Sequence, residues 1–266
     1  MTVTPLTRYI YPYDWDLAVI ANQARYPCHP SVPVLLGADV VTDEIYLTSV
    51  ELDQLGLSHS CIRPTNNNNN QEMSRIDADF VLPSEIASID LVPRVGIRRI
   101  VRNCRLKVDF PALLRKAVNV SELIVKHETV IDSRTSTLTV TSTNETLTGL
   151  VHLGDVTVYR GIKPDEKFDN AVVLGAQSSQ NPHCLFEQHA YLDIRVKIPF
   201  KSAIESHILK TYRKNTSDGR KLDMDLMEAA QLEQEQSRIE ERIKVGPMEK
   251  SSESPRCSGN PNLTTL

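Results

Sequence analysis

The central part of the chain alternates its side chains with the period of a β-strand. Three runs, 122–132, 137–144 and 153–160, are rich in β-branched residues, place odd and even positions on two faces, and are separated by turn residues. This pattern predicts three strands of an antiparallel meander. The many threonines of the middle run fit a strand with one wet face or one that lines a partly polar cavity. A fourth run, 184–198, predicts a further long strand.

The segments before the meander predict shorter strands and one helix. Asp14 stands where an N-cap belongs, ahead of a helical pattern that begins at Trp15 and is ended by Pro27. The remaining predicted strands are Leu6–Tyr11, Val40–Tyr46 and Gly96–Lys107.

Two stretches interrupt this order of strands. Residues 65–94 contain the homopolymer Asn66–Asn70 and are otherwise polar and punctuated by prolines, so we expect a disordered insertion that loops out of the domain. After the strand that ends near Lys107, Asp109 as a cap and Pro111 in the first turn predict a short helix. Because it lies between two strands, this helix is a candidate lid. The lid residues are Phe110, Leu113, Leu114 and Val118.

The last third of the chain predicts one long helix. Its apolar residues recur at helical spacing, and the predicted inward stripe is Ile204, Ile208, Thr211 or Tyr212, Asn215, Leu222, Leu226 and Ala229. The stripe thins beyond Ala230, so we expect a domain at 1–230 and a helical extension with a disordered acidic tail at 231–266. The predicted fold class is α+β, with a curved antiparallel sheet that grips the C-terminal helix around a cavity.

Charge and cysteine usage narrow the classes of function. From Asp223 onward there are nine acidic and five basic residues, which accounts for the whole formal charge of -4 and leaves a neutral body. A neutral body argues against a nucleic-acid binder that neutralises many phosphates. The five cysteines are scattered without a C-x-x-C pair, which argues against a zinc site or a disulfide framework.

Several motifs, in order along the chain, resemble those of the PRELI family. YDWDLAVIANQARYPCHP has the Trp that opens the first helix and the Arg-Tyr-Pro that follows it, and FPALLRKAVN resembles the short lid helix. HETVIDSRTSTLTVTSTNETLTGLVHLGDVTVY is very similar to the meander, and IESHILKTYRKNTSDGRKLDMDLM resembles the terminal helix. The Ser-Thr-Asn and Gly-Arg steps are most similar to the slowmo branch. The resemblance covers residues 4–231, apart from the insertion at 65–94.

This resemblance implies a START-like fold with a lipid cavity and no catalysis, cofactor or metal. It implies a phospholipid transfer protein of the mitochondrial intermembrane space, which carries a single anionic phospholipid between the two membranes. The implied partners are a small helical protein with twin CX9C motifs and, transiently, the membrane surface. The slowmo branch is associated with phosphatidylserine and a sister branch with phosphatidic acid.

The resemblance also assigns the residues of a headgroup site. Arg25 falls on the basic residue at the cavity floor, where a guanidinium can pair with a phosphate. Asn215 falls on the helix residue that faces the headgroup, with Thr211 one turn before it. Asp218, three residues after Asn215, departs from the basic residue of the family, and we expect its charge to favour an ammonium group over a doubly charged phosphate.

A second hypothesis is an enzyme built on the same kind of cavity. It would require inward-facing His127, Asp155 and His189 to converge, whereas apolar walls with Arg25 inside would favour a carrier. His183 and His189 are six residues apart, too far to share one metal ion on a straight strand.

Overall fold

The computed structural model of the protein describes residues 1–55, 63–64, 78–83, 95–107, 120, 122–163, 166, 171–174, 183–195 and 201–245. The chain divides into two compact units, Met1–Ala230 and Gln231–Leu266. The sheet and the candidate site belong to the first unit. The predicted lid residues Phe110, Leu113, Leu114 and Val118 lie outside the described part.

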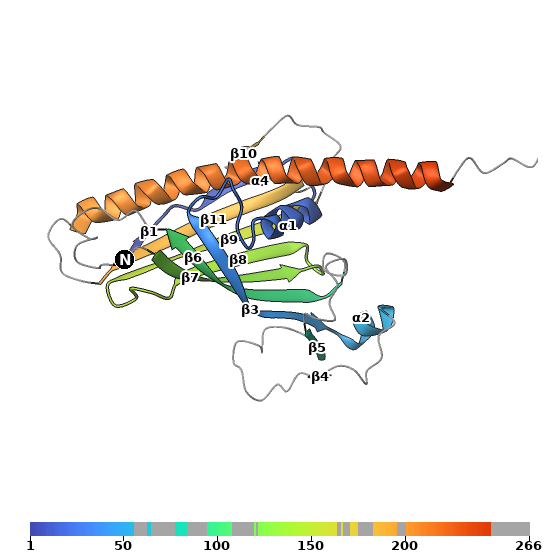
Figure 1. Ribbon diagram of the computed structural model, residues 1–266, viewed down its shortest axis with the longest axis horizontal. Helices are drawn as coiled ribbons and strands as arrows, with labels where there is room; N and C mark the ends of the chain where they lie inside the picture. The colour runs from blue at the N-terminus through green and yellow to red at the C-terminus, as the bar shows by residue number, and fades with distance from the viewer. Residues whose placement is uncertain are drawn as a thin grey trace, which may run out of the picture. The chain divides into compact units, whose positions relative to one another are not determined.

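One sheet of eleven strands organises the described part of the first unit (Figure 1). The strands are β1 (Thr2–Val3), β2 (Thr7–Tyr11), β3 (Leu35–Leu47), β4 (Arg63–Pro64), β5 (Phe80–Pro83), β6 (Ile97–Lys107), β7 (Glu122–Asp132), β8 (Thr137–Asn144), β9 (Val151–Ile162), β10 (Val172–Val173) and β11 (His183–Ile194). The order across the sheet is β10, β2, β11, β9, β8, β7, β6, β3, β5, β4, and β1 also pairs with β11. All pairs are antiparallel except β10 with β2.

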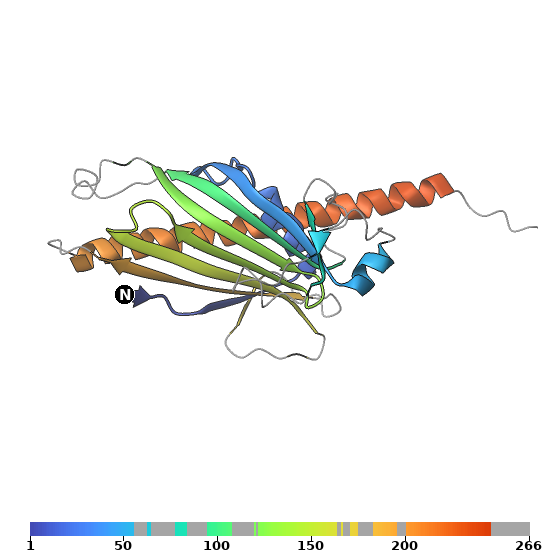
Figure 2. The ribbon, with the colours of Figure 1, turned by 90° about the horizontal axis from the view of Figure 1, so that it is seen from below.

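Two helices lie on the same face of this sheet, which we call the inner face. They are α1 (Trp15–Ala24) and α4 (Lys201–Val245), and only residues 201–230 of α4 belong to the first unit. Figure 2 shows the sheet from the opposite side, with both helices behind the strands. The predicted α+β fold, a large antiparallel sheet with a long C-terminal helix, is confirmed.

The strand register decides which side chains share the inner face. Val140 on β8 lies opposite Thr129 on β7 and Thr157 on β9, and all three are buried. Because side chains alternate between the two faces of a strand, every second residue from these positions also faces α1 and α4. The inner face is therefore a set of transverse rows, each with one residue from every strand that it crosses.

One local prediction is wrong, one helix was not predicted, and one predicted N-cap lacks its hydrogen bond. Residues 80–83 lie inside the expected insertion but form β5, which pairs with β3 and buries Leu82, because an apolar strand can complete the edge of a sheet. Helix α2 (Ser49–Gln54) was not predicted, although Thr48 and Glu51 form the capping box that signals a helix start. Asp14 occupies the N-cap position of α1, but its side chain makes no capping hydrogen bond.

No helix in the described ranges is both long and apolar enough to cross a bilayer.

Candidate functional site

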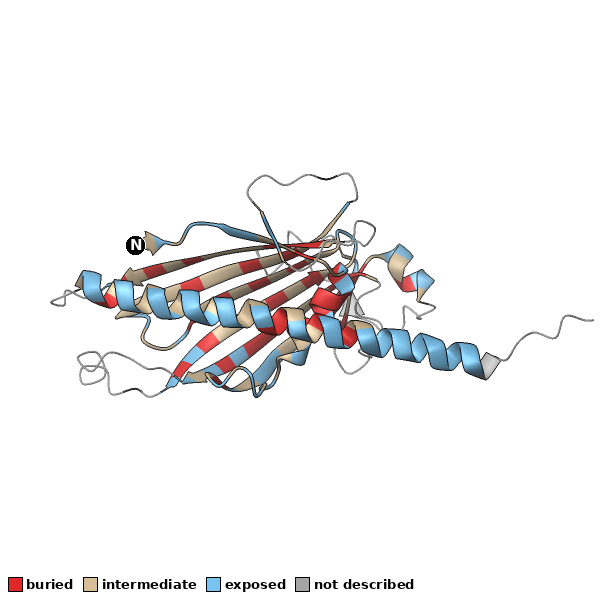
Figure 3. Cartoon of the chain, turned by 90° about the horizontal axis from the view of Figure 1, so that it is seen from above, coloured by how far each residue is buried: buried red, intermediate tan, exposed pale blue. Residues whose placement is uncertain are grey.

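One end of the inner face is a closed core. The side chains of Tyr11, Ile131, Leu138 and Tyr159 are at most 2% exposed, and they belong to one apolar cluster with Trp15 of α1 and Met227 of α4. Phe186 on β11 meets the rings of Tyr11 and Tyr159 edge to face, with centroids 5.7 and 5.1 Å apart. Such aromatic pairs stabilise a core beyond their buried area. Most of the buried positions of α4 gather near α1 (Figure 3). We call this region the closed end.

A partly buried ion pair joins α1 to α4 at the closed end. Arg25, the C-cap residue of α1, pairs with Asp223 of α4, and its Nη2 also donates to the carbonyl oxygen of Gly219 at 3.1 Å. The carboxylate of Asp223, which is 2% exposed, accepts hydrogen bonds from Tyr159 Oη at 2.9 Å and Tyr11 Oη at 3.4 Å. Burial raises the pKa of both tyrosines, so both hydroxyls keep the protons that they donate.

This pairing changes the expected role of Arg25. The family resemblance implied that its guanidinium pairs with a phosphate, but the carboxylate of Asp223 already neutralises it. Asp223 was missed, although one signal was present: a carboxylate between Leu222 and Met227 interrupts an apolar stripe, and a buried charge needs a partner.

A second guanidinium on the inner face has no carboxylate partner among the described residues. Arg102 on β6 is 6% exposed, and its Nη2 donates to Gln23 Oε1 at 2.6 Å. Its guanidinium carbon lies 4.3 Å from the ring centroid of Tyr26, a cation–π contact. Its Nη1 is buried and has no hydrogen-bond partner in the part of the chain that is described. Burial lowers the pKa of Arg102, but an arginine ordinarily titrates so far above neutrality that it stays charged.

His127 completes the surroundings of Arg102. It lies directly opposite Arg102 in the strand register, and its Nδ1 is 3.0 Å from Tyr26 Oη. Burial, followed by the positive charges of Arg102 and Arg25, lowers the pKa of His127 to about 4. The imidazole is therefore neutral at pH 7. We call Gln23, Tyr26, Arg102 and His127 the Arg102 cluster.

The row that begins at Arg102 and His127 continues across the sheet as polar residues. Ser142 lies opposite His127, and Asp155 lies opposite Ser142. Burial raises the pKa of Asp155, and hydrogen bonds to Ser142, Gln188 and Thr157 oppose that shift. The register therefore places one uncompensated cation and one half-buried carboxylate in the same row, with a neutral histidine and a serine between them.

The enzyme hypothesis required a triad that this register does not form. His189 lies opposite Val156 and points to the outer face, because its neighbour Ala190 is the residue opposite Asp155. Ser142 also separates His127 from Asp155 by a whole strand. The three residues proposed for catalysis are thus not brought together.

The other end of the inner face, which we call the open end, is packed less completely. A small buried cluster consists of Leu192 and Ile194 on β11 and Ile204 on α4. The surrounding apolar side chains are only partly buried: Val151, Leu153, Ile208 and Leu209. Tyr212 is near this end on α4, and its hydroxyl is buried without a hydrogen-bond partner in the described ranges. The open end thus combines incompletely covered apolar surface with one hydroxyl, that of Tyr212, that is unpaired among the described residues.

Comparison with known proteins identifies the family. The model of the PRELI-like family matches residues 81–232, more than half of the chain. The chain belongs to the PRELI-like family. The family predicted from the sequence motifs is therefore confirmed.

Curated relatives of this PRELI-like chain are distant and much longer. "Protein real-time" of Aedes aegypti is 21% identical over 80% of the chain and 24% of the relative. "Protein real-time" of Drosophila melanogaster is 20% identical over 80% of the chain and 23% of the relative. A CRAL-TRIO domain-containing protein of Caenorhabditis elegans is 20% identical over 80% of the chain and 21% of the relative. The chain thus spans about a quarter of the length of these relatives.

The α4 residues that the resemblance assigned to the headgroup do not face inward. Asn215, Thr211 and Asp218 are all exposed, so the prediction that Asn215 shares the inward face of Ile208 and Leu222 is wrong. Instead the inward positions include Ile208, Tyr212, Gly219 and Asp223. Several of the inward positions are four residues apart, and each such step advances by about 40° around the helix. The contact stripe therefore winds around α4, whereas a seven-residue spacing predicts a stripe nearly parallel to the helix axis.

Metal binding has no support in the described residues. They contain no group of three or more His, Cys, Asp or Glu side chains that could hold an ion. Three of the cysteines are described, and Cys28, Cys104 and Cys184 are all free thiols.

Proposed function

We propose that this PRELI-like chain binds one phospholipid at the inner face and carries it between membranes without altering it chemically. Membership of the family points to lipid binding and transfer. The observation that carries the assignment of the site is Arg102, a buried guanidinium with an unpaired Nη1 and no carboxylate partner among the described residues. Burying an unpaired charge costs several kcal/mol, and an anion that binds there would offset part of that cost.

A phosphate is the anion that suits the Arg102 cluster. A guanidinium binds phosphate oxygens through parallel N–H donors, and charge-assisted bonds of this kind are about twice as strong as neutral ones. Tyr26 and Gln23 orient the guanidinium from one side and leave Nη1 for the ligand. In this proposal Arg102 takes the phosphate-binding role that the sequence assigned to Arg25.

The open end supplies the apolar partner that acyl chains need. Leu153 and Val151 on β9 lie opposite Leu192 and Ile194 on β11, and the two β9 residues stay partly exposed. Each methylene that an acyl chain buries contributes about 0.8 kcal/mol. A lipid with its phosphate at Arg102 and its chains against this surface would satisfy both features at once.

Transfer between liposomes tests this proposal. Donor liposomes would carry a fluorescent anionic phospholipid with a quencher, and acceptor liposomes would carry neither. We expect transfer by the wild type and a decrease of about tenfold or more in Arg102→Met, because one charge-assisted contact contributes about 1.5–3 kcal/mol. The matched control is Arg105→Met, an exposed residue of the same strand, which should leave the rate within about twofold.

Two results would contradict the proposal. One is a folded wild type that moves no lipid, and the other is an Arg102→Met variant that transfers as fast as Arg105→Met. Mass spectrometry of the acceptor lipid should find the headgroup and acyl chains unchanged, since the proposal includes no bond-breaking step.

The finer assignments follow from the motif resemblance. We infer that the carried lipid is phosphatidylserine, with phosphatidic acid as the alternative, and that the protein works in the mitochondrial intermembrane space. We also infer a small helical partner with twin CX9C motifs, together with transient contact with the membrane surface. Protease protection in fractionated mitochondria tests the location. A ligand that binds only the folded state raises the melting temperature of the protein. A melting temperature that stays constant as the partner is added would therefore count against the partnership.

A further inference from the structure

The charges on the inner face nearly cancel. Arg98 binds Asp43 through two hydrogen bonds, of 2.7 and 2.5 Å, and Arg25 pairs with Asp223. His127 is neutral at pH 7, since its pKa is lowered to about 4. Asp155 is three strands away from Arg102 along the row, about 14 Å at ordinary strand spacing, which is beyond direct contact. The region around Arg102 therefore carries one net positive charge.

Asp223 limits the net charge around Arg102 to one, because it neutralises Arg25. Tyr26, which directly follows Arg25 in the chain, has the guanidinium of Arg102 over its ring at 4.3 Å, and its hydroxyl is 3.0 Å from His127 Nδ1. Burial raises the pKa of Tyr26 and lowers that of His127, and the positive charges of Arg25 and Arg102 act on both side chains. Without Asp223 the surroundings of Tyr26 and His127 would hold two cations. Tyr11 and Tyr159 fix the carboxylate from the other side, which makes it a rigid part of the closed end.

We propose that Asp223 is a built-in counter-ion that selects lipids with a singly charged phosphodiester over lipids with a phosphomonoester. This inference rests on the proposed function. A phosphodiester carries one negative charge, which Arg102 matches. A phosphomonoester carries about 1.5 to 2 negative charges at pH 7, and its second charge would meet an arginine that Asp223 already neutralises. Like charges brought together in a poorly hydrated site destabilise the complex.

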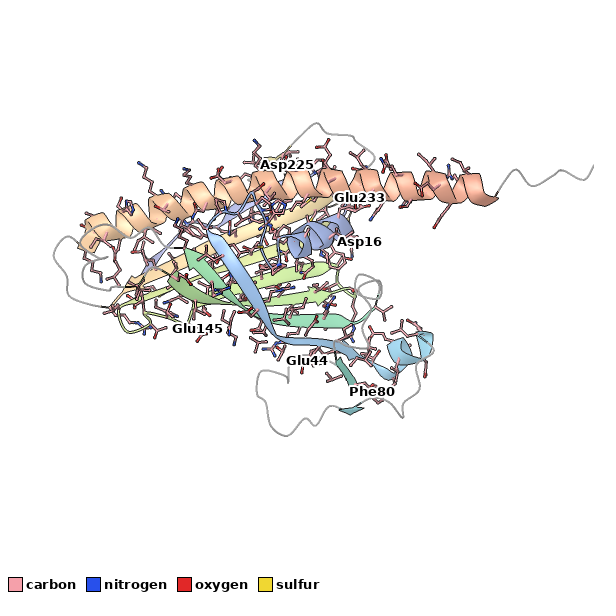
Figure 4. The ribbon with its side chains drawn as sticks, in the orientation of Figure 1. Asp16, Glu44, Phe80, Glu145, Asp225 and Glu233 are labelled. Carbon is pink, nitrogen blue, oxygen red and sulfur yellow. The ribbon has the colours of Figure 1, made fainter. Side chains whose placement is uncertain are left out.

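The experiment compares transfer of phosphatidylserine, phosphatidylglycerol and phosphatidic acid with identical acyl chains. The wild type should move both phosphodiesters faster than phosphatidic acid. Asp223→Asn keeps the shape and removes the charge, so the ratio of phosphatidic acid to phosphatidylglycerol transfer should rise about tenfold. The matched control is Asp225→Asn, an exposed residue on the outer side of the same helix (Figure 4), which should leave the ratio unchanged.

A double variant separates charge from shape. Arg25→Gln with Asp223→Asn removes one cation and one anion, so the net charge returns to that of the wild type, and the ratio should return with it. Excess inorganic phosphate in the same assay tells a phosphate site from a lipid site. Competition that slows transfer of every lipid equally would show that the headgroup phosphate binds at the site that free phosphate can occupy.

The outcomes distinguish this inference from the proposed function. If the wild type moves none of the three lipids, the proposed function is wrong. If it moves them but prefers phosphatidic acid, or if a folded Asp223→Asn keeps the wild-type ratio, only the selectivity of Asp223 is overturned. If Asp223→Asn does not fold, the test is the wild-type ratio of phosphatidic acid to phosphatidylglycerol transfer, and a preference for phosphatidic acid overturns the inference.

Discussion

The two ends of the inner face are built from the same strands but differ in what their side chains lack. At the closed end the apolar side chains of Tyr11, Leu138 and Tyr159 are buried, and Arg25 is paired with Asp223. At the open end Leu153 and Ile208 are only partly covered. Between the two ends, Arg102 has no carboxylate partner in the described part of the chain. The closed end can be stable by itself, whereas the open end gains from whatever it binds.

This difference shows how one sheet can provide both stability and a binding surface. Removing a side chain that already has its partners within the protein lowers the free energy of unfolding. Removing a side chain that lacks such partners weakens ligand binding, because the ligand supplies the missing contact. Variants at matched positions in the two regions should therefore separate the free energy of unfolding from lipid transfer.

The largest effect should come from breaking the ion pair at the closed end. Asp223→Ala leaves Arg25 without a counter-ion and Tyr11 and Tyr159 without an acceptor. We expect the free energy of unfolding to fall by about 3–5 kcal/mol, as for other buried pairs that lose one member. Urea denaturation followed by circular dichroism measures this. A loss below about 1 kcal/mol would show that the pair is not a structural element of the closed end.

Truncating one leucine at each end compares the packing directly. Leu138→Ala should lower the free energy of unfolding by about 3 kcal/mol, because this side chain is fully buried. Leu153→Ala should lower it by about 1 kcal/mol, because its side chain is only partly covered. The same urea titration serves for both variants. Equal losses would mean that the two ends are packed alike.

Acid should reveal the buried histidine between the ends. The pKa of His127 is lowered from 6.5 to about 4, so the folded state disfavours its protonation. Stability from this group is complete above about pH 6.5, declines as the pH falls toward about 4, and is constant below that. The loss should be about 3 kcal/mol, because a difference of one pKa unit corresponds to about 1.4 kcal/mol. His127→Gln should remove this part of the pH dependence, and an unchanged stability profile between pH 6.5 and 4 would contradict the assignment.

The smallest effect on stability should come from Arg102. Replacing an unpaired buried charge with an apolar group of similar size is often neutral or stabilising, so Arg102→Met should change the free energy of unfolding by less than about 1 kcal/mol. Arg25→Met, in contrast, should destabilise the protein strongly, since it leaves Asp223 buried and unpaired. Thermal melts of the two variants provide the test, and a similar loss for both would erase the distinction between the two arginines.

Local patterns carried most of the fold. The alternation in residues 122–160 predicted β7, β8 and β9, and the helical spacing after residue 200 predicted α4, because both depend only on neighbours within a few residues. The exceptions had local causes as well. The polar character of residues 65–94 concealed β5, which exists because β3 offers it an edge. Helix α2 was short enough for its capping box to be overlooked.

By itself, the sequence determined the fold class, the family and the presence of arginines suited to a phosphate. Only the tertiary structure decided which arginine is available. Arg25 and its carboxylate are 198 residues apart, and Arg102 and its amide partner are 79 residues apart, so no local spacing connects them. The direction of Asn215 was decided in the same way, because small angular steps accumulate along α4 until its inward face has turned past that residue. The sequence specifies which side chains are charged, but the tertiary structure determines which groups they contact.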